Sequence, residues 1–297
     1  MKKILFLSDG KAYLPEIEAY KKVFSEYICV DSRNETNINL CEYDLIWKFM
    51  GMDFGKIDRP IIHEYSSASV GMFPKVKNTI KFLLNSKPSV RIFLNEEVRK
   101  QFLFNDGVPC FYRDMGIDDI FFQLVDTEKT YDFVYVGEIS EKRNIDIMLK
   151  KFANDLSEYS LLLIGKYETG LYEQYKNCNN IFFAGFIKYE EVPFWACKSK
   201  YALNYIPNKY PYYLQTSTKL LEYNIALNLK IITTDYEWVN KFEQERKMQF
   251  LKTNLSLDNI NDNYLKSFNF KNTDINDLRW RTVIEKSRIK EWIKDNI

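Results

Sequence analysis

Short apolar runs alternate with longer helical segments along almost the whole chain. Residues 3–9 are predicted to form a first strand and residues 14–26 a helix, and the alternation continues to a strand at residues 229–235. Strands that alternate with helices in this way form parallel sheets whose faces are covered by the helices. The sequence therefore predicts an α/β fold, and ligands in such folds bind beyond the carboxyl ends of the strands.

The pattern restarts after a polar segment near the middle of the chain. Residues 123–130 are polar, and a new strand begins at residue 131. We place the boundary near residue 128, which gives an amino-terminal domain of residues 1–127 and a second domain of residues 128–297. A chain of 297 residues is long enough for two domains of ordinary size. We expect two Rossmann-like, doubly wound domains that face each other across a cleft, with ligands bound in that cleft.

Composition and charge exclude several classes of protein. Lys and Arg number 42 against 41 Asp and Glu, so the net charge gives no reason to expect a nucleic-acid partner. The five cysteines are widely spaced and there is one histidine, so no metal site is predicted, and the simplest interpretation is thiols in a reducing cytoplasm. The first apolar run is too short for a signal peptide, and no run approaches the roughly 20 apolar residues of a membrane span. We therefore expect a cytoplasmic protein.

One segment departs from this neutral balance. Between Gly71 and Lys100 the chain has seven basic residues and two acidic ones, with apolar residues such as Phe73 and Ile80 among them. Such a segment is usually a solvated helix face. The alternative is that residues 73–100 rest on anionic lipid headgroups at the inner face of the cell membrane. Each nearby Lys or Arg would then contribute on the order of 1 kcal/mol.

Polar groups follow the predicted strands of the second domain. Gly137 ends the strand that starts at residue 131, and a turn with Ser140 and Lys142 precedes the next helix; Gly165 ends the following strand. Because parallel strands end at one edge of their sheet, we expect these groups to converge. Ser140 suits either a helix cap or a phosphate donor. Lys142 suits either an ordinary turn charge or a contact to a diphosphate.

A hydroxyl-rich segment precedes a helix later in the second domain. It consists of Thr216, Ser217 and Thr218, and the helix that follows carries Lys219 and Glu222. A helix start presents unpaired backbone N–H groups, which suit a phosphate. A carboxylate about one and a half turns further along can accept two hydrogen bonds from the vicinal diol of a ribose. These groups together predict a site for a nucleoside diphosphate.

The only histidine, His63, lies near the end of a strand predicted at residues 59–65. Two interpretations stay open: a residue on the rim of a catalytic site, or a structural residue whose hydrogen bonds are satisfied locally. Glu64 and Tyr65 follow it. They either line the acceptor side of the cleft or pack within the domain.

The second domain resembles the retaining glycosyltransferases of the GT-B fold, the group that builds bacterial surface polysaccharides, such as lipopolysaccharide or capsule, and glycolipids. Four segments carry the resemblance in the family's order and spacing: YVGEISEKRNIDIMLKKFA, LLLIGKYE, NNIFFAGFIKYEEVPFWACKSKYAL and TSTKLLEYNIALNLKIITTD. It extends over residues 131–240, and over the amino-terminal half only in outline. The resemblance implies a last helix, at about residues 276–297, that crosses back to the first domain.

The resemblance also implies a role for each matching residue of the second domain. Lys142 is expected to contact the donor diphosphate, and Glu222 the ribose. The backbone of residues 216–218 is expected to hold the distal phosphate. The chain at Phe186 and Ile187 is expected to border the nucleobase.

In the first domain the resemblance is carried by single positions. His63 falls where many family members have a histidine beside the reacting sugar, which implies a place in the catalytic site. Gly10 and Lys11 occupy the first strand-to-helix loop, which in the family approaches the donor phosphates or the acceptor.

Two positions depart from the family pattern. Glu138 stands where the family often has a basic residue, and Leu214 stands where the first of two paired glutamates is expected. One positive charge and one carboxylate of the family are therefore missing. Our hypothesis is that Lys219 or Arg143 replaces the lost positive charge.

The function that the resemblance implies is transfer of a hexose-type sugar from a UDP- or GDP-sugar to a hydroxyl of a glycan or lipid-linked acceptor. The family resemblance further implies retention at the anomeric carbon and no metal or other cofactor. Two alternatives stay open: a catalytically degenerate binding or assembly subunit, which the departures at Glu138 and Leu214 favour, and a sugar-nucleotide epimerase of similar architecture.

Overall fold

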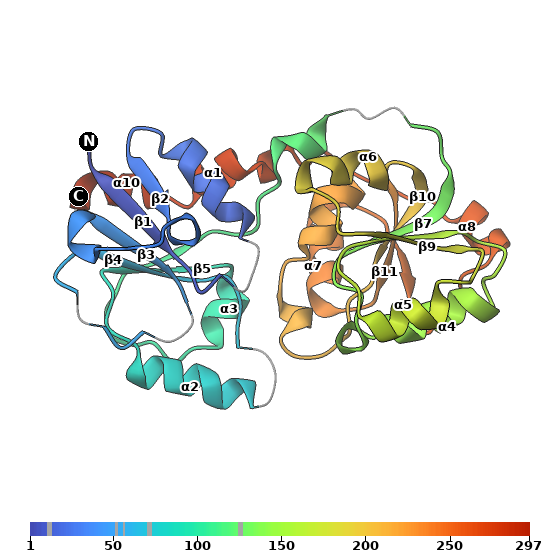
Figure 1. The fold of residues 1–297 in the computed structure, drawn as a ribbon, viewed down its shortest axis with the longest axis horizontal. Helices are drawn as coiled ribbons and strands as arrows, with labels where there is room; N and C mark the ends of the chain where they lie inside the picture. Colours follow the sequence, from blue (N-terminus) through green and yellow to red (C-terminus); the bar gives the residue numbers. More distant parts are fainter. Residues whose placement is uncertain (11–13, 51–52, 56, 70–72, 124–126) are drawn as a thin grey trace. The chain divides into compact units, whose positions relative to one another are not determined.

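A computed structural model of the protein describes residues 1–297 except 11–13, 51–52, 56, 70–72 and 124–126, and except the side chains of residues 223 and 225. The chain forms two compact units. The first consists of Met1–Gly116 together with Asp277–Ile297, and the second of Ile117–Asn276. Each unit contains a six-stranded sheet with helices on both faces (Figure 1).

The first unit is built on a parallel sheet with the strand order β2-β1-β3-β4-β5-β6. Its strands are β1 (Lys3–Leu7), β2 (Ile28–Asp31), β3 (Leu45–Phe49), β4 (Ile61–Tyr65), β5 (Val90–Phe93) and β6 (Cys110–Tyr112). Its helices are α1 (Pro15–Val23), α2 (Pro74–Leu84), α3 (Glu96–Lys100), α9 (Trp280–Lys286) and α10 (Ile289–Asn296), with short 3₁₀ turns at Ser32–Asn34 and Leu40–Glu42.

Helices cover the two faces of this sheet. Helices α1, α9 and α10 pack on the face that presents Phe6 and Trp47, and Ile284, Ile289 and Ile293 contribute to that core. On the other face Tyr65 and Phe93 form an aromatic cluster with Phe102 and Phe104, beneath α2 and α3. In Figure 1 these two groups of helices lie on opposite sides of the sheet.

The end of the chain differs from the single amphipathic helix predicted for it. Arg288 adopts a left-handed conformation with φ of 60°, which ends α9 and starts α10 in a new direction. Both helices belong to the first unit, where Trp280 packs so closely on Gly116 that a Cβ there would lie 2.5 Å from the indole ring.

The contact division between the units also falls at Gly116, earlier than the boundary placed near residue 128, because Phe121 packs against Tyr189 of the second unit.

The second unit is built on a parallel sheet with the order β12-β11-β10-β7-β8-β9. Its strands are β7 (Tyr131–Val136), β8 (Leu161–Ile164), β9 (Ile181–Gly185), β10 (Ser199–Asn204), β11 (Lys230–Thr234) and β12 (Leu251–Thr253). Its helices are α4 (Ile145–Asn154), α5 (Thr169–Tyr175), α6 (Val192–Ala196), α7 (Glu237–Arg246), α8 (Asp262–Ser267) and a π-helix (Leu220–Ile225). Its 3₁₀ turns are Asp119–Phe122, Glu141–Arg143, Tyr189–Glu191 and Tyr212–Leu214, and one more, Asn276–Leu278, spans the second junction of the units.

Both sheets are doubly wound, as predicted. In the second unit the strand order reverses between β7 and β10, and in the first it reverses between β1 and β3. In open parallel sheets the crevice at such a reversal, beyond the carboxyl ends of the strands, is the preferred place for a ligand. The α/β fold class with two Rossmann-like domains is therefore confirmed. Within the described part of the chain, no helix combines the length and the apolar character required to cross a membrane.

Candidate functional site

Three glycines lie at the carboxyl edge of the second sheet. Gly137 and Gly165 follow β7 and β8 and have φ of 146° and 142°, and Gly185 ends β9 with φ of 72°. The backbones approach closely, because a Cβ built on Gly165 would lie 2.0 Å from the carbonyl oxygen of Gly137. Only glycine fits this conformation and this spacing. The edge next to the β7–β10 reversal therefore presents bare backbone.

Lys219 covers this bare backbone at Gly137. A Cβ on Gly137 would lie 2.8 Å from Cε and 3.3 Å from Nζ of Lys219, and the amine also lies 5.6 Å from the centre of the Tyr135 ring. Burial, assisted by the nearby Arg143 guanidinium, lowers the pKa of Lys219 to about 8, although Glu222 and Glu138 oppose the shift. A partly desolvated ammonium of this kind gains most when an anion is placed beside it.

Arg143 lies close to the same glycine turn. Its guanidinium lies 4.8 Å from the centre of the Tyr212 ring, and its Nε lies 3.6 Å from Oε2 of Glu138. Glu138, the position where the family often has a basic residue, is thus held by an exposed ion pair. The structure brings Lys219 and Arg143 to the same glycine turn, and the hypothesis that one of them replaces the lost positive charge stays a prediction.

Glu222 lies in the π-helix and is almost fully buried. Its Oε1 accepts a hydrogen bond of 2.5 Å from the hydroxyl of Tyr189, whose ring packs edge-on against Phe121. A π-helix is uncommon and is often found at functional sites, because the wider turn re-aims side chains. Tyr189 was not predicted from the sequence, and no local motif marks it.

The hydroxyl-rich segment begins its helix as predicted, but its three members differ. The helix starts at Thr218, and Ser217 caps it by accepting the N–H of Leu220 at 3.4 Å. The Ser217 hydroxyl also donates to Asn204 at 2.6 Å, and Asn204 in turn contacts Thr233 and Tyr236. Ser217 is therefore engaged in a buried network, while Thr216 and Thr218 are half-buried.

The turn predicted after Gly137 is formed, and its residues Ser140 and Lys142 differ in burial. Ser140 is buried at the start of the 3₁₀ turn, where its carbonyl accepts the N–H of Arg143 at 3.1 Å. Its hydroxyl makes no cap and has no hydrogen-bond partner among the described residues, so the cap, one of the two interpretations, is not formed, and the role as a phosphate donor stays a prediction. Lys142 is exposed, and its carbonyl accepts from the amine of Lys209 at 3.4 Å.

Phe186 and Ile187 follow β9 at the same edge. Phe186 is largely exposed, and the amine of Lys166 lies 5.8 Å from its ring centre. Both residues line a groove of about 600 Å³ that continues along β9 to Trp195 of α6.

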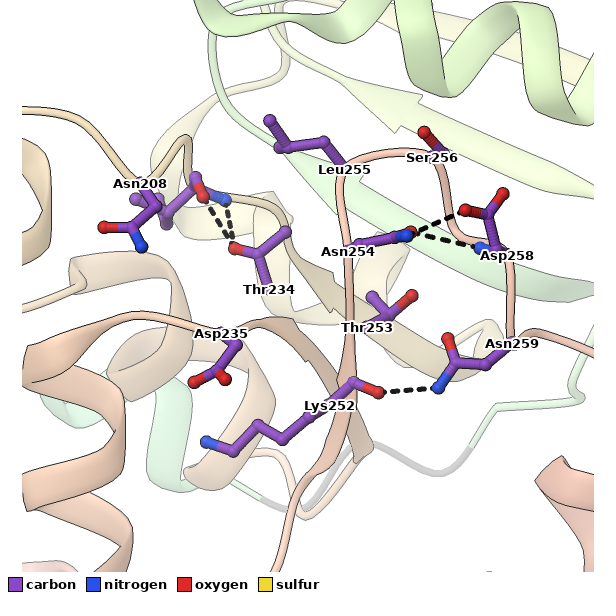
Figure 2. Close-up of a pocket in the computed structure, with 11 residues that line it drawn as sticks. Asn208, Thr234, Asp235, Lys252, Thr253, Asn254, Leu255, Ser256, Asp258 and Asn259 are labelled. Atoms are coloured by element: carbon purple, nitrogen blue, oxygen red, sulfur yellow. Dashed lines mark hydrogen bonds between the residues drawn. The ribbon is translucent and has the colours of Figure 1, made fainter.

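A second recess lies at the ends of β10, β11 and β12 (Figure 2), and it contains none of the predicted residues. Its volume is about 750 Å³. Among the lining residues, Asn254 donates to Asp258 at 2.7 Å, and Asn259 donates to the carbonyl of Lys252 at 2.8 Å. The hydroxyl of Thr253 is buried without a partner in the described part of the chain. Thr234, Asp235, Ser256 and Asn208 add further hydroxyl, carboxylate and amide groups to the lining, which also includes the apolar side chains of Ile206 and Leu255.

His63 is fully buried in the middle strands of the first sheet, and not on a rim. Its Nε2 lies 3.0 Å from Oδ2 of Asp53, and the same carboxylate accepts hydrogen bonds from Lys48 at Oδ1, 2.7 Å, and from Ser86 at Oδ2, 2.5 Å. Burial lowers the pKa of His63 to about 4, despite the opposing effect of Asp53. Its predicted placement on the rim of a cleft is corrected. Strand β4 runs between β3 and β5, and the histidine side chain lies on the same face of the sheet as Tyr65, the face covered by α2 and α3.

Glu64 and Tyr65 are buried too, and not on an open acceptor side. Glu64 forms an ion pair with the buried Arg113 and accepts hydrogen bonds from Trp47 at 2.8 Å and from Tyr20 at 3.1 Å. Tyr65 stacks on Phe93 at 5.1 Å within the aromatic cluster. Both residues stabilise the first unit. A central strand of a parallel sheet is covered on both faces, which explains this burial.

The remaining predicted residues lie in the first loop. Gly10 is exposed and has φ of 71°. Lys11 lies outside the described residues. Among the described residues, no group of three or more His, Cys, Asp or Glu side chains is arranged to hold a metal ion.

No family model and no curated protein matches this sequence. Solved structures match it over nearly its whole length. HepE of Anabaena in complex with UDP and glucose has a TM-score of 0.64 at 12% identity, over 99% of both chains. AviGT4, a glycosyltransferase involved in avilamycin A biosynthesis, has a TM-score of 0.57 at 10% identity, over 100% of this chain and 96% of its own. MnaA of S. aureus with UDP has a TM-score of 0.54 at 10% identity, over 99% and 97%. At such identities the likeness shows the fold, and that fold is GT-B.

Proposed function

We propose that the protein is a glycosyltransferase that binds a nucleoside-diphosphate sugar at the carboxyl edge of the second sheet and transfers the sugar to a hydroxyl group. The observation that carries this proposal is the placement of Lys219 against Gly137, beside Arg143 and the buried Glu222, at the reversal of strand order. Two of the compared structures, HepE and MnaA, were solved with UDP. UDP is therefore the nucleotide that we expect first, with GDP as the alternative.

Each part of the donor has a candidate partner in this arrangement. The diphosphate is expected beside Lys219 and the backbone N–H groups at the helix start, with Lys142 and Arg143 as further cations. The ribose diol is expected to bind Glu222, which already accepts one hydrogen bond from Tyr189. The nucleobase is expected against the backbone at Phe186 and Ile187.

The transfer places its main demand on the leaving group. Negative charge grows on the diphosphate as the bond to the sugar stretches, and fixed donors aimed at it stabilise the transition state more than the ground state. We propose that Lys219 and Arg143 supply this stabilisation. Retention, a hexose as the sugar, and a glycan or lipid-linked acceptor are part of the same proposal and follow from the family resemblance.

Donor binding tests the role of Glu222. The Glu222→Gln variant is expected to bind UDP about 10- to 100-fold more weakly by titration calorimetry. The reason is that a hydrogen bond to a charged group is worth about 1.5–3 kcal/mol. Glu245→Gln, an exposed carboxylate on α7, is the matched control and is expected to bind UDP as the parent protein does. Equal affinity of the parent and Glu222→Gln would contradict the ribose role.

The pH dependence of UDP binding tests Lys219. A diphosphate favours the protonated amine, so binding raises the pKa of Lys219 above the value of about 8 that it has without ligand. Affinity is therefore expected to stay level below pH 8 and to fall as the pH rises above it. The measurement is the dissociation constant of UDP from pH 7 to 9 for the parent and for Lys219→Met.

The variant lacks the titrating amine, so the difference between the two curves removes the titration of UDP itself. We expect Lys219→Met to bind UDP more weakly than the parent at pH 7. Once the titration of UDP itself is subtracted, its affinity is expected to stay level as the pH rises. Parallel curves for the two proteins would mean that Lys219 does not contact the diphosphate.

A binding or assembly subunit without catalysis is the second candidate function. It is favoured by Leu214, which is buried in a 3₁₀ turn where the family has a carboxylate. Such a subunit would bind UDP-sugar without consuming it, so hydrolysis of the donor by the purified protein separates the two candidates. Analysis of the sugar nucleotide recovered from the same assay would detect an epimerase.

A further inference from the structure

Helix α2 of the first unit carries an apolar stripe on its exposed side. The stripe consists of Phe73, the residue before the helix, and of Val76, Ile80, Leu83 and Leu84, whose exposed fractions lie between 38 and 70%. Spacings of three and four residues place these side chains on one side of the helix. Amphipathic helices of soluble proteins normally turn their apolar side toward the core. Here it is turned outward.

The opposite side of α2 is the one that packs on the unit. Asn78 is buried and accepts the backbone N–H of Ser69 at 3.0 Å, and Phe82 packs edge-on against Phe104 at 5.8 Å. The helix is therefore seated on its unit by Asn78 and Phe82, and the stripe remains exposed without contributing to the core.

Charge decides which partner suits the stripe. Residues 73–95 contain no Asp or Glu, and Lys75, Lys77 and Lys81 lie on the helix among the apolar residues. Lys75 and Lys77 are exposed, and Lys81 is half-buried. A helix that lies in a membrane interface has this composition, because aliphatic and aromatic side chains enter the acyl boundary while lysines reach the anionic headgroups.

We propose that the α2 stripe docks the protein on a bilayer that contains anionic lipid. This inference goes beyond donor binding and does not depend on it. Membrane attachment through α2 would bring the unit to lipid-linked molecules.

Vesicle co-sedimentation tests the proposal. The parent protein is expected to bind vesicles of phosphatidylcholine with phosphatidylglycerol at least about 25-fold more tightly than vesicles of phosphatidylcholine alone, because the two exposed lysines contribute roughly fivefold each. Binding is expected to weaken as salt is added. Equal binding to both vesicles, or none to either, would overturn the proposal.

Two variants separate the stripe from general hydrophobicity. Leu83→Glu removes a residue of the stripe that is 66% exposed, and Leu103→Glu replaces a leucine elsewhere in the unit that is 62% exposed. We expect Leu83→Glu to lose at least tenfold in binding to the anionic vesicles and Leu103→Glu to bind like the parent. Equal losses in both variants would contradict a specific role for α2.

Two further measurements complete the test. Sedimentation velocity of the parent and of Leu83→Glu reports the oligomeric state: if the substitution converts a dimer to a monomer, the stripe is an interface between copies and the membrane proposal is wrong. UDP affinity of Leu83→Glu is expected to equal that of the parent. Loss of vesicle binding with normal UDP affinity therefore supports the docking role, whatever the outcome for the donor site.

Discussion

Gly165→Ala is expected to lower the free energy of unfolding of the second unit by at least about 3 kcal/mol, the range of severe packing and backbone defects. The added Cβ would lie 2.0 Å from the carbonyl oxygen of Gly137 and 2.8 Å from its carbonyl carbon. Both contacts are with backbone, which cannot rotate away as a flexible side chain would. The φ of 142° adds strain for any residue with a Cβ. The measurement is urea unfolding followed by circular dichroism.

Gly170→Ala is the matched control for this experiment. Gly170 lies in α5 of the same unit, and a Cβ at this position meets no atom within 4 Å. Alanine favours a helix by about 0.5–1 kcal/mol over glycine, so this variant is expected to be slightly more stable than the parent. If Gly165→Ala unfolds at the same urea concentration as Gly170→Ala, the close approach of the two strand ends is not present in the folded protein.

The sequence identifies these glycines as strand ends but not as neighbours. Gly137 and Gly165 each follow an apolar run, which is a local signal. Their contact arises because β7 pairs with β8 in parallel register, from Phe133 with Leu161 to Val136 with Ile164. Most strands of both sheets carry the same local signal. Strand β6 (Cys110–Tyr112) and strand β12 (Leu251–Thr253) are only three residues long and were not predicted.

The partners of the site residues could not be predicted because they come from distant segments. Tyr189 is 33 positions from Glu222, and Arg113 is 97 positions from Glu16, with which it forms a buried ion pair. Nothing near Arg113 in the sequence marks it as a buried cation. The π-helix at residues 220–225 could not be predicted either, because its sequence has the periodicity of an ordinary helix. The placement of Lys219 over Gly137 likewise depends on tertiary structure.

His63 shows the limit of strand periodicity most clearly. Residues 61–65 are buried throughout, so neither alternation nor polarity tells which face each side chain takes. The polar pair His63–Glu64 resembled a strand end that opens into a loop. The structure instead gives each residue a partner inside the unit: Nε2 of His63 lies against Asp53, and Glu64 pairs with Arg113. A role for His63 in sugar transfer stays a prediction, and its burial gives it a different, measurable consequence.

The stability of the first unit is expected to fall by about 3 kcal/mol between pH 6.5 and pH 4, through His63 alone. The pKa of His63 is lowered from 6.5 to about 4 in the folded protein, chiefly by burial. In this window the unfolded chain binds a proton at His63 that the folded chain excludes, so acid favours unfolding. Above pH 6.5 neither state is protonated, and the full stability is present. The pKa of Asp53 is lowered from its ordinary 3.8 to about 2 in the folded protein, so its contribution to stability is lost mainly as the pH falls below about 4.

The single histidine makes this prediction clean to test. Urea unfolding of the parent at intervals from pH 7 to pH 4.5 is expected to show a falling midpoint, whereas His63→Gln, which cannot titrate, is expected to be less stable at pH 7 but level across the same range. The imidazole resonances in an NMR titration report the folded pKa directly, because no other histidine overlaps them. A folded pKa near 6.5 would mean that water reaches the imidazole and that its contact with Asp53 is open to solvent. An equal fall of the unfolding midpoint with pH in His63→Gln would mean the same. In that case the earlier assignment of His63 to a rim exposed to ligands would regain its physical basis.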